Sequence, residues 1–203
     1  MSRVVLATFN PRKLVELRRI LEPLTGSVQV LGLDDVGGFE EPVETEPSFA
    51  GNALLKARVA VAATGLPALA DDSGLCVDAL NGMPGVLSAR WSGTARDDAA
   101  NNALLLAQLR DVPPQRRGAE FRCAVALVLT DGTEVVEEGV MRGRLLSAPR
   151  GSGGFGYDPL FVADGHDVTS AELSAQAKDA VSHRGRALRA IAPAVAAALT
   201  PRS

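Results

Sequence analysis

The spacing of apolar positions changes along the chain, and these changes predict a mixture of strands and helices. The run Val4 to Ala7 is apolar and rich in β-branched residues, which is typical of a buried strand. Asn10 then suits a helix N-cap, and Pro11 suits the first helical position. An apolar stripe along that helix is formed by Leu14, Leu17, Leu21 and Leu24. The chain is therefore expected to begin with a strand, a tight turn and a helix.

The remaining pattern predicts strands and helices without strict alternation. Strands are expected at residues 28–31, 68–70, 75–80, 121–129, 134–145 and 160–163. The two longest form a hairpin across Asp131-Gly132, which is a strong turn signal. Helices are expected at residues 52–64, 98–109, 175–181 and 182–199. Pro193 should kink or interrupt the last of them. The prediction is an α/β fold, with a mixed central sheet flanked by helices.

Composition and charge restrict the classes of function. With 203 residues, 46% hydrophobic and 22% charged, the chain fits a single domain, 1–203, that buries a substantial core. A net charge of −3 argues against a protein that grips nucleic acid. We expect a cytoplasmic protein, because there is no signal-peptide-like region and no apolar run of about 18 residues. Cys76 and Cys123 are expected to be buried free thiols.

Donor side chains gather at the first turn between strand and helix. Thr8, Arg12 and Lys13 lie where helix amides and the positive end of a helix dipole would point at one spot. This favours an anion site, most naturally for a phosphate chain. The alternative is an ordinary connection with cations facing solvent. Neither a P-loop nor a dinucleotide-binding glycine pattern is present.

Two adjacent carboxylates, Asp71 and Asp72, follow an apolar strand and are closed by Ser73-Gly74. A turn of this kind can hold Mg²⁺, which takes one or two protein carboxylates and completes its shell with water and phosphate. The acidic run from Glu40 to Glu46 can supply a second ligand. The alternative is a solvated turn with a capping aspartate.

A glycine-rich loop from Gly151 to Pro159 contains an aromatic side chain and a carboxylate. Lys178 and the segment Ser182 to Gly185 follow it. Glycines allow the backbone to approach a ligand closely, and an aromatic ring can stack on a base. The alternative is a flexible surface loop ahead of a cationic helix.

Together these segments resemble the ITP/XTP pyrophosphatase family, which removes non-standard purine nucleoside triphosphates. The resemblance covers the chain from about Val4 to Leu199. It rests on motifs in family order, namely the (Ser/Thr)-x-Asn-x-x-Lys element Thr8 to Lys13, Ser48-Phe49 with Asn52 and Lys56, Ala70 to Gly74, Gly82 to Gly85 with Ser88 to Gly93, Gly153 to Pro159, Ala171 to Leu173, Lys178, and Ser182 to Gly185.

The resemblance implies a role for each matching position. Glu44 and Asp72 would bind Mg²⁺, and Asp72 would also accept the proton of the attacking water. Ser73 would touch the substrate, and Lys56 would lie near the phosphates. The triphosphate would be lined by Thr8, Phe9, Asn10, Pro11, Arg12 and Lys13. The base pocket would be formed by Phe155, Gly156, Tyr157, Asp158, Lys178, His183 and Arg184.

The chain departs from the family pattern at two places. Ala50 and Gly51 stand where an acidic residue is common, and Ala177 stands where a glutamate often precedes the lysine. These departures put in doubt an additional metal ligand and a carboxylate that orients the lysine.

The implied activity is Mg²⁺-dependent cleavage of ITP, dITP and XTP between the α- and β-phosphates, with release of the monophosphate and pyrophosphate. The resemblance also implies a homodimer and a two-lobed structure with the active site in a cleft between the lobes. An alternative is a nucleotide-binding regulator that keeps the pocket without turnover. A nucleic-acid-binding protein is disfavoured by the net charge and by the absence of a matching motif.

Overall fold

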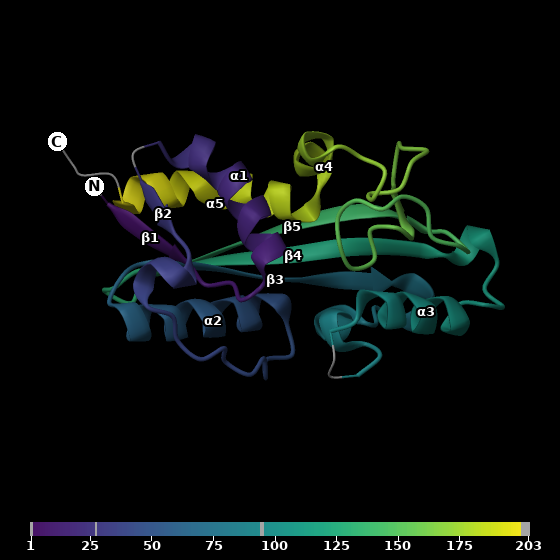
Figure 1. Cartoon of the computed structure of the whole chain (residues 1–203), viewed down its shortest axis with the longest axis horizontal. Coiled ribbons are helices and arrows are strands. Elements are labelled where there is room, and N and C mark those ends of the chain that lie inside the picture. Colours follow the sequence, from purple (N-terminus) through teal and green to yellow (C-terminus); the bar gives the residue numbers. More distant parts are fainter. Residues whose placement is uncertain (1, 27, 94–95, 200–203) are drawn as a thin grey trace. The chain divides into compact units, whose positions relative to one another are not determined.

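The computed structural model describes residues 2–26, 28–93 and 96–199. A six-stranded sheet has the order β2-β1-β3-β4-β5-β6. Its strands are β1 (Arg3–Leu6), β2 (Gln29–Leu31), β3 (Ala68–Val77), β4 (Gly118–Val128), β5 (Glu134–Leu145) and β6 (Phe161–Ala163). The helices are α1 (Pro11–Thr25), α2 (Phe49–Thr64), α3 (Asp98–Gln108), α4 (Ala175–Val181) and α5 (His183–Leu199), and they are labelled in Figure 1.

The sheet contains both parallel and antiparallel neighbours. β1 runs parallel to β2 and to β3, and β5 runs antiparallel to β6. β4 and β5 are neighbours joined by residues 129–133. Because that connection is too short for a parallel crossover, these two strands form a hairpin. The predicted mixed sheet with flanking helices is therefore confirmed, including the hairpin.

The chain divides into two compact units. Unit 1 contains residues up to Asp72, the segment Cys123–Gly139 and the residues from Arg184 onward, and unit 2 contains Ser73–Arg122 and Val140–His183. The boundaries fall inside β3, β4 and β5. Each of these strands therefore contributes residues to both units.

Two layers of apolar side chains form the core of unit 1, one on each face of its strands. Val4 and Leu6 pack with α1 and α5, whereas Val5 and Ala7 pack with α2. This division follows from the strand geometry, because successive side chains point to opposite faces. In Figure 1, α1 and α5 cover one face of β1 and α2 covers the other.

The core of unit 2 is built on β4, β5 and β6 and includes the glycine-rich loop. Phe121 and Phe161 pack with ring centroids 4.7 Å apart. Tyr157 and Leu160, which end the loop, belong to the same cluster and are buried. The loop is thus anchored at one end in a hydrophobic core.

The expected turn at residues 71–74 is wrong, because β3 continues from Ala68 to Val77. The strand can continue because cations from distant parts of the chain pair with both buried carboxylates: Lys13 contacts Asp71, and Lys56 contacts Asp72. Charge compensation of this kind is not visible in the local sequence.

Smaller differences concern single positions. Pro193 lies inside α5 and does not end it. Leu24 is 42% exposed, so the buried stripe of α1 is shorter than expected. Cys123 is buried, but Cys76 is only half-buried, and both are free thiols. No helix in the part of the chain that the structure describes is long and apolar enough to cross a membrane.

Candidate functional site

The turn before α1 is closed by the side chain of Asn10. Its Oδ1 accepts from the amides of Arg12 (3.0 Å) and Lys13 (3.4 Å), and its carbonyl accepts from the amide of Leu14 (3.0 Å). Pro11 has no amide hydrogen. The amides of the first helical turn are therefore already engaged. An anion at this turn would depend on side-chain donors more than on the helix amides considered from the sequence.

The other predicted side chains of the turn have varied exposure. Arg12 and Pro11 are exposed, and Thr8 is half-buried. The Thr8 hydroxyl accepts from the amide of Asn10 at 3.3 Å. The ring of Phe9 packs edge-to-face on Phe39, with centroids 5.5 Å apart, which fixes the direction of the turn.

Behind the turn lies a buried network of alternating charges. Lys13 Nζ is 3.1 Å from Asp71 Oδ2, and the guanidinium of Arg184 donates to the same oxygen at 3.2 Å. Arg184 also donates to Glu16 Oε2 at 2.8 Å. Burial alone would raise the pKa of Asp71, but Lys13 and Arg184 outweigh it and hold that pKa below its ordinary value. Asp71 therefore remains ionised and anchors both cations.

Asp72 points to the other face of β3, where it meets residues of α2. Lys56 Nζ lies 3.3 Å from Asp72 Oδ1 and 3.0 Å from Glu44 Oε1. The side-chain amide of Asn52 donates to the second Asp72 oxygen at 3.2 Å, and its oxygen accepts from the amide of Glu46. Glu44 and Asp72, the two predicted metal ligands, thus contact the same cation, Lys56.

Burial raises the pKa of Asp72, although the charge of Lys56 offsets part of this effect. The pKa of Lys56 is nevertheless raised, because the attraction of Asp72, Asp71 and Glu44 exceeds the effect of burial. A carboxylate with a raised pKa is a stronger base than an ordinary aspartate. Asp72 is therefore suited to take a proton from water.

The donor set at Glu44 and Asp72 fits a divalent cation of the magnesium type. Both ligands are hard carboxylate oxygens, and Mg²⁺ needs one or two of them when phosphate and water supply the remainder. Among residues 2–26, 28–93 and 96–199, no group of three or more His, Cys, Asp or Glu side chains is placed to hold a metal ion. A metal held by Glu44 and Asp72 would therefore need water and phosphate to complete its coordination.

A second cluster of predicted residues lies in unit 2. Lys178 Nζ forms an ion pair with Asp158 Oδ2 at 2.6 Å and stands 4.9 Å from the ring centroid of Phe155. The same Asp158 oxygen accepts from the amide of Phe155 at 2.8 Å. A side chain at Gly154 would collide with this carboxylate, which explains the glycine there. The structure therefore brings Phe155, Asp158 and Lys178 together.

The other residues predicted for the base pocket pack against or bond to neighbouring protein groups. The hydroxyl of Tyr157 donates to the carbonyl of Ser88 at 2.9 Å, and burial raises the pKa of Tyr157. The ring of His183 is buried and stacks on Phe121, with centroids 4.8 Å apart. Arg184 belongs to unit 1, where Asp71 and Glu16 hold it. Ser73 is half-buried in β3, directly after Asp72.

Comparisons with known proteins show the family of this chain. The model of the Ham1 family matches residues 4–194. The chain belongs to the Ham1 family. A Nocardia farcinica relative named dITP/XTP pyrophosphatase is 64% identical, over 97% of this chain and 96% of its own. A Frankia alni relative of the same name is 60% identical, over 98% of this chain and 99% of its own.

Solved structures of the family support the fold. The crystal structure of the nucleoside-triphosphatase, or dITP/XTP pyrophosphatase, of Mycobacterium abscessus matches with a TM-score of 0.77 at 57% identity, covering 94% of this chain and 99% of that one. A HAM1 protein of Coxiella burnetii matches with a TM-score of 0.86 at 38% identity, covering 96% and 98%. The family resemblance and the mixed α/β fold predicted from the sequence are confirmed.

Several residues that contact the site of this Ham1 family member were missed from the sequence. Glu16 lies three positions after Lys13, and this helical spacing was its only signal. Asn52 was noted as part of a motif but not assigned to Asp72. Asp98 and Asn102 of α3 contact the backbone of Gly156. Nothing in the local sequence connects them with a loop more than 50 residues away.

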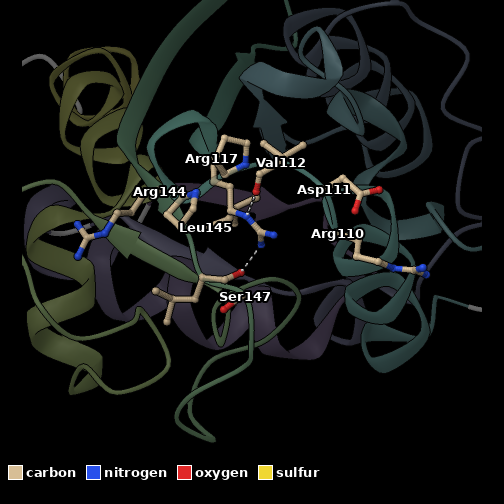
Figure 2. A pocket seen from close by; sticks show the side chains of 10 residues that line it. Arg110, Asp111, Val112, Arg117, Arg144, Leu145 and Ser147 are labelled. Atoms are coloured by element: carbon tan, nitrogen blue, oxygen red, sulfur yellow. Dashed lines mark hydrogen bonds between the residues drawn. The ribbon is translucent and has the colours of Figure 1, made fainter.

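Unit 2 also contains a cavity of about 440 Å³ that includes none of the predicted site residues. It is lined by Arg110, Asp111, Val112, Pro113, Pro114, Arg117, Arg144, Leu145, Leu146 and Ser147. The buried guanidinium of Arg117 donates to the carbonyls of Leu109, Val112 and Leu146. In Figure 2, Arg110 and Arg144 extend away from Arg117 on opposite sides. The three arginines do not converge, and Arg117 ties the segment before β4 to the end of β5.

Proposed function

We propose that the protein is a Mg²⁺-dependent nucleoside triphosphate pyrophosphatase acting on ITP, dITP and XTP. It would release the nucleoside monophosphate and pyrophosphate, which clears non-standard purines from the nucleotide pool. The observation that carries the proposal is the convergence of Glu44 and Asp72 on one cation. The Nocardia farcinica relative named dITP/XTP pyrophosphatase, at 64% identity, supports the substrate class.

Glu44 and Asp72 would hold the metal through their carboxylate oxygens. When bound, Mg²⁺ would neutralise charge on the phosphates and favour ionisation of water. Asp72, whose pKa is raised by burial, would accept the proton of the water that attacks the α-phosphorus. The Lys13 ammonium would stabilise the pyrophosphate leaving group, with the exposed Arg12 beside it.

Lys56 and Lys13 differ in their carboxylate partners. Lys56 lies between the two candidate metal ligands and contacts both of their carboxylates. Lys13 is held by Asp71 and is 16% exposed at its side chain, so it can contact a ligand without leaving its partner. These contacts support a phosphate-binding role for both lysines, beside Thr8 and the Phe9–Pro11 turn.

Base recognition is assigned to the cluster of Phe155, Asp158 and Lys178, together with the neighbouring Gly156 and Tyr157. Phe155 is half-buried, and we propose that its ring stacks on the base. Hypoxanthine and xanthine carry a 6-oxo acceptor where adenine carries a 6-amino donor. Cationic donors therefore favour ITP over ATP. His183 and Arg184 remain proposed members of this pocket, although Asp71 and Glu16 already occupy two guanidinium nitrogens of Arg184.

Product analysis tests the proposal. Incubation with ITP and Mg²⁺ should yield IMP and pyrophosphate without IDP, and an excess of EDTA should abolish turnover. ATP should react much more slowly under the same conditions. Formation of IDP and orthophosphate would overturn the assignment of the α-phosphorus.

A nucleotide-binding regulator without turnover is the alternative function. The contacts of Asp72 and Glu44 with Lys56, and of Lys13 with Asp71, favour the enzyme. Tight binding of ITP in calorimetry, without product after long incubation, would favour the regulator instead.

We further propose that residues 1–203 act as one pyrophosphatase domain in a cytoplasmic homodimer that does not bind nucleic acid. The dimer rests on the family resemblance, and the low net charge argues against a nucleic-acid partner. Light scattering at micromolar concentration should give the mass of two chains. A monomer at all concentrations would contradict the dimer.

A further inference from the structure

Two side chains of α3 hold the backbone of the glycine-rich loop at Gly156. Asp98 Oδ2 accepts from the amide of Gly156 at 2.9 Å, and the side-chain amide of Asn102 donates to the carbonyl of the same residue at 2.9 Å. Both groups of one residue's backbone are therefore bound by a single helix. All three residues belong to unit 2.

The backbone conformation of Gly156 depends on contacts with other parts of the chain. Its φ of +62° lies in the left-handed region, which glycine adopts without steric cost. The residue lies in a loop without a strand or helix of its own, between β5 and β6. Because glycine is permissive, the hydrogen bonds from α3 select one conformation among several.

The neighbouring residue, Phe155, is held from its other side. Its amide donates to Asp158 Oδ2, which also binds Lys178. Phe155 thus lies between two carboxylates: Asp158 binds its own amide, and Asp98 binds the amide of the next residue. Hydrogen bonds thus fix the backbone on both sides of the Phe155 side chain.

We propose that Asp98 and Asn102 are positioning residues that hold Gly156 so that Phe155 and Lys178 meet the purine base in a preorganised arrangement. This inference rests on the proposed function, because it assumes that the loop binds the base. Neither residue needs to touch the substrate. Their effect is to reduce the ordering that the loop would otherwise undergo on binding.

The expected kinetic effect follows from where these residues act. A base-binding loop contributes to the ground state and the transition state alike, so loss of its preorganisation raises KM and leaves kcat nearly unchanged. Loss of the charge-assisted bond in Asp98→Ala should raise the KM for ITP by about tenfold. Asp98→Asn retains an acceptor and should recover part of the affinity.

Asp97 offers a matched control on the preceding residue. It is exposed and caps α3 by accepting from the amides of Ala99 (2.9 Å) and Ala100 (3.0 Å). Asp97→Ala therefore weakens the helix start without removing the bonds to Gly156. Asn102→Ala removes the second of these bonds and should also raise KM, by a smaller factor.

The experiment measures kcat and KM for ITP, and amide hydrogen exchange of residues 153–157, in wild type and the four variants. Support requires a raised KM and faster exchange in Asp98→Ala and Asn102→Ala, but not in Asp97→Ala. Equal changes in Asp97→Ala would show a general effect of α3 and overturn the inference. An unchanged KM in both loop variants would also overturn it.

Two further outcomes remain decisive. If Asp98→Ala does not fold, Asp98→Asn and Asn102→Ala carry the test, and wild-type KM values in both would contradict the inference. If wild type does not turn over ITP, the proposed function is wrong, but the positioning role can still be tested. The Kd for ITP, measured by calorimetry, is then compared between variants in place of KM. Similar Kd values, or no binding at all, in wild type and Asp98→Ala would overturn the positioning role.

Discussion

Asp71 and Asp72 are adjacent in β3, but their carboxylates have different partners on opposite faces of the strand. Asp71 meets Lys13 and Arg184, whereas Asp72 meets Lys56 and Asn52. Lys13 and Arg184 outweigh burial and lower the pKa of Asp71, whereas burial raises the pKa of Asp72 and Lys56 offsets only part of that rise. Asp71 thus anchors two cations, whereas Asp72 has the pKa shift that the proposed base requires.

This division of roles predicts different consequences for the two asparagine substitutions. Asp72→Asn should lower kcat by about 10²–10⁴ while the fold survives, because the general base is lost. Asp71→Asn should lower kcat less, but should lower the free energy of unfolding by about 3 kcal/mol, because it leaves buried cations short of a partner. Steady-state kinetics and urea denaturation of both variants provide the measurement. Equal losses of kcat would indicate a shared metal site.

Arg184 provides a test of the buried network. Arg184→Met should lower the free energy of unfolding by about 3–5 kcal/mol, since Asp71 and Glu16 keep buried carboxylates. The matched control is Arg58→Met, which removes an exposed pair with Glu134 and should cost much less, because solvent screens that pair. A similar cost for both variants would contradict the structural role. In the folded fraction, the ITP-to-ATP ratio of kcat/KM reports whether Arg184 also reads the base.

At the scale of elements, α1 carries the candidate phosphate site at its first turn. Asn10 was expected to cap this helix from the sequence alone, and the structure confirms it. Capping depends on residues within one turn, so local sequence is sufficient. The prediction of a turn at residues 71–74 was wrong because this segment depends on distant residues. The cations that stabilise the strand come from positions 13, 56 and 184.

Substitutions at Asn10 test the cap. Asn10→Ala should lower the free energy of unfolding by about 1 kcal/mol, because the amides of Arg12 and Lys13 lose their acceptor. Asn10→Asp retains an acceptor and should stay close to wild type in stability. Denaturant unfolding monitored by circular dichroism is the measurement. An unchanged midpoint in Asn10→Ala would mean that water replaces the cap without cost.

The candidate site also combines features that local sequence determines with features that depend on long-range folding. Motif residues such as Lys178 and Asp158 could be named from the sequence, because type and order carry the resemblance. Their pairing, and the contact of Asp98 with Gly156, depend on how unit 2 folds. Burial also could not be read from the motif: Arg184 looks like a ligand-binding cation in sequence, but its side chain is 2% exposed.

At the scale of the whole molecule, the two units share the strands β3, β4 and β5. Because strand pairing runs through the boundaries, neither unit has a complete sheet of its own. We therefore expect one cooperative unfolding transition. Trp91, the sole tryptophan, lies in unit 2, so its fluorescence reports on that unit while circular dichroism reports on all helices. Coincident denaturation midpoints are predicted, and separate midpoints would show that the units fold independently.

In the proposed reaction, water activated by Asp72 attacks the α-phosphorus of the nucleotide. Turnover of ITP with Mg²⁺ in H₂¹⁸O, followed by mass spectrometry of both products, tests it most directly. Attack at the α-phosphorus should place the heavy oxygen in IMP and leave pyrophosphate unlabelled. Label in pyrophosphate would mean attack at the β-phosphorus, and the assignment of the reacting centre beside Asp72 would be contradicted.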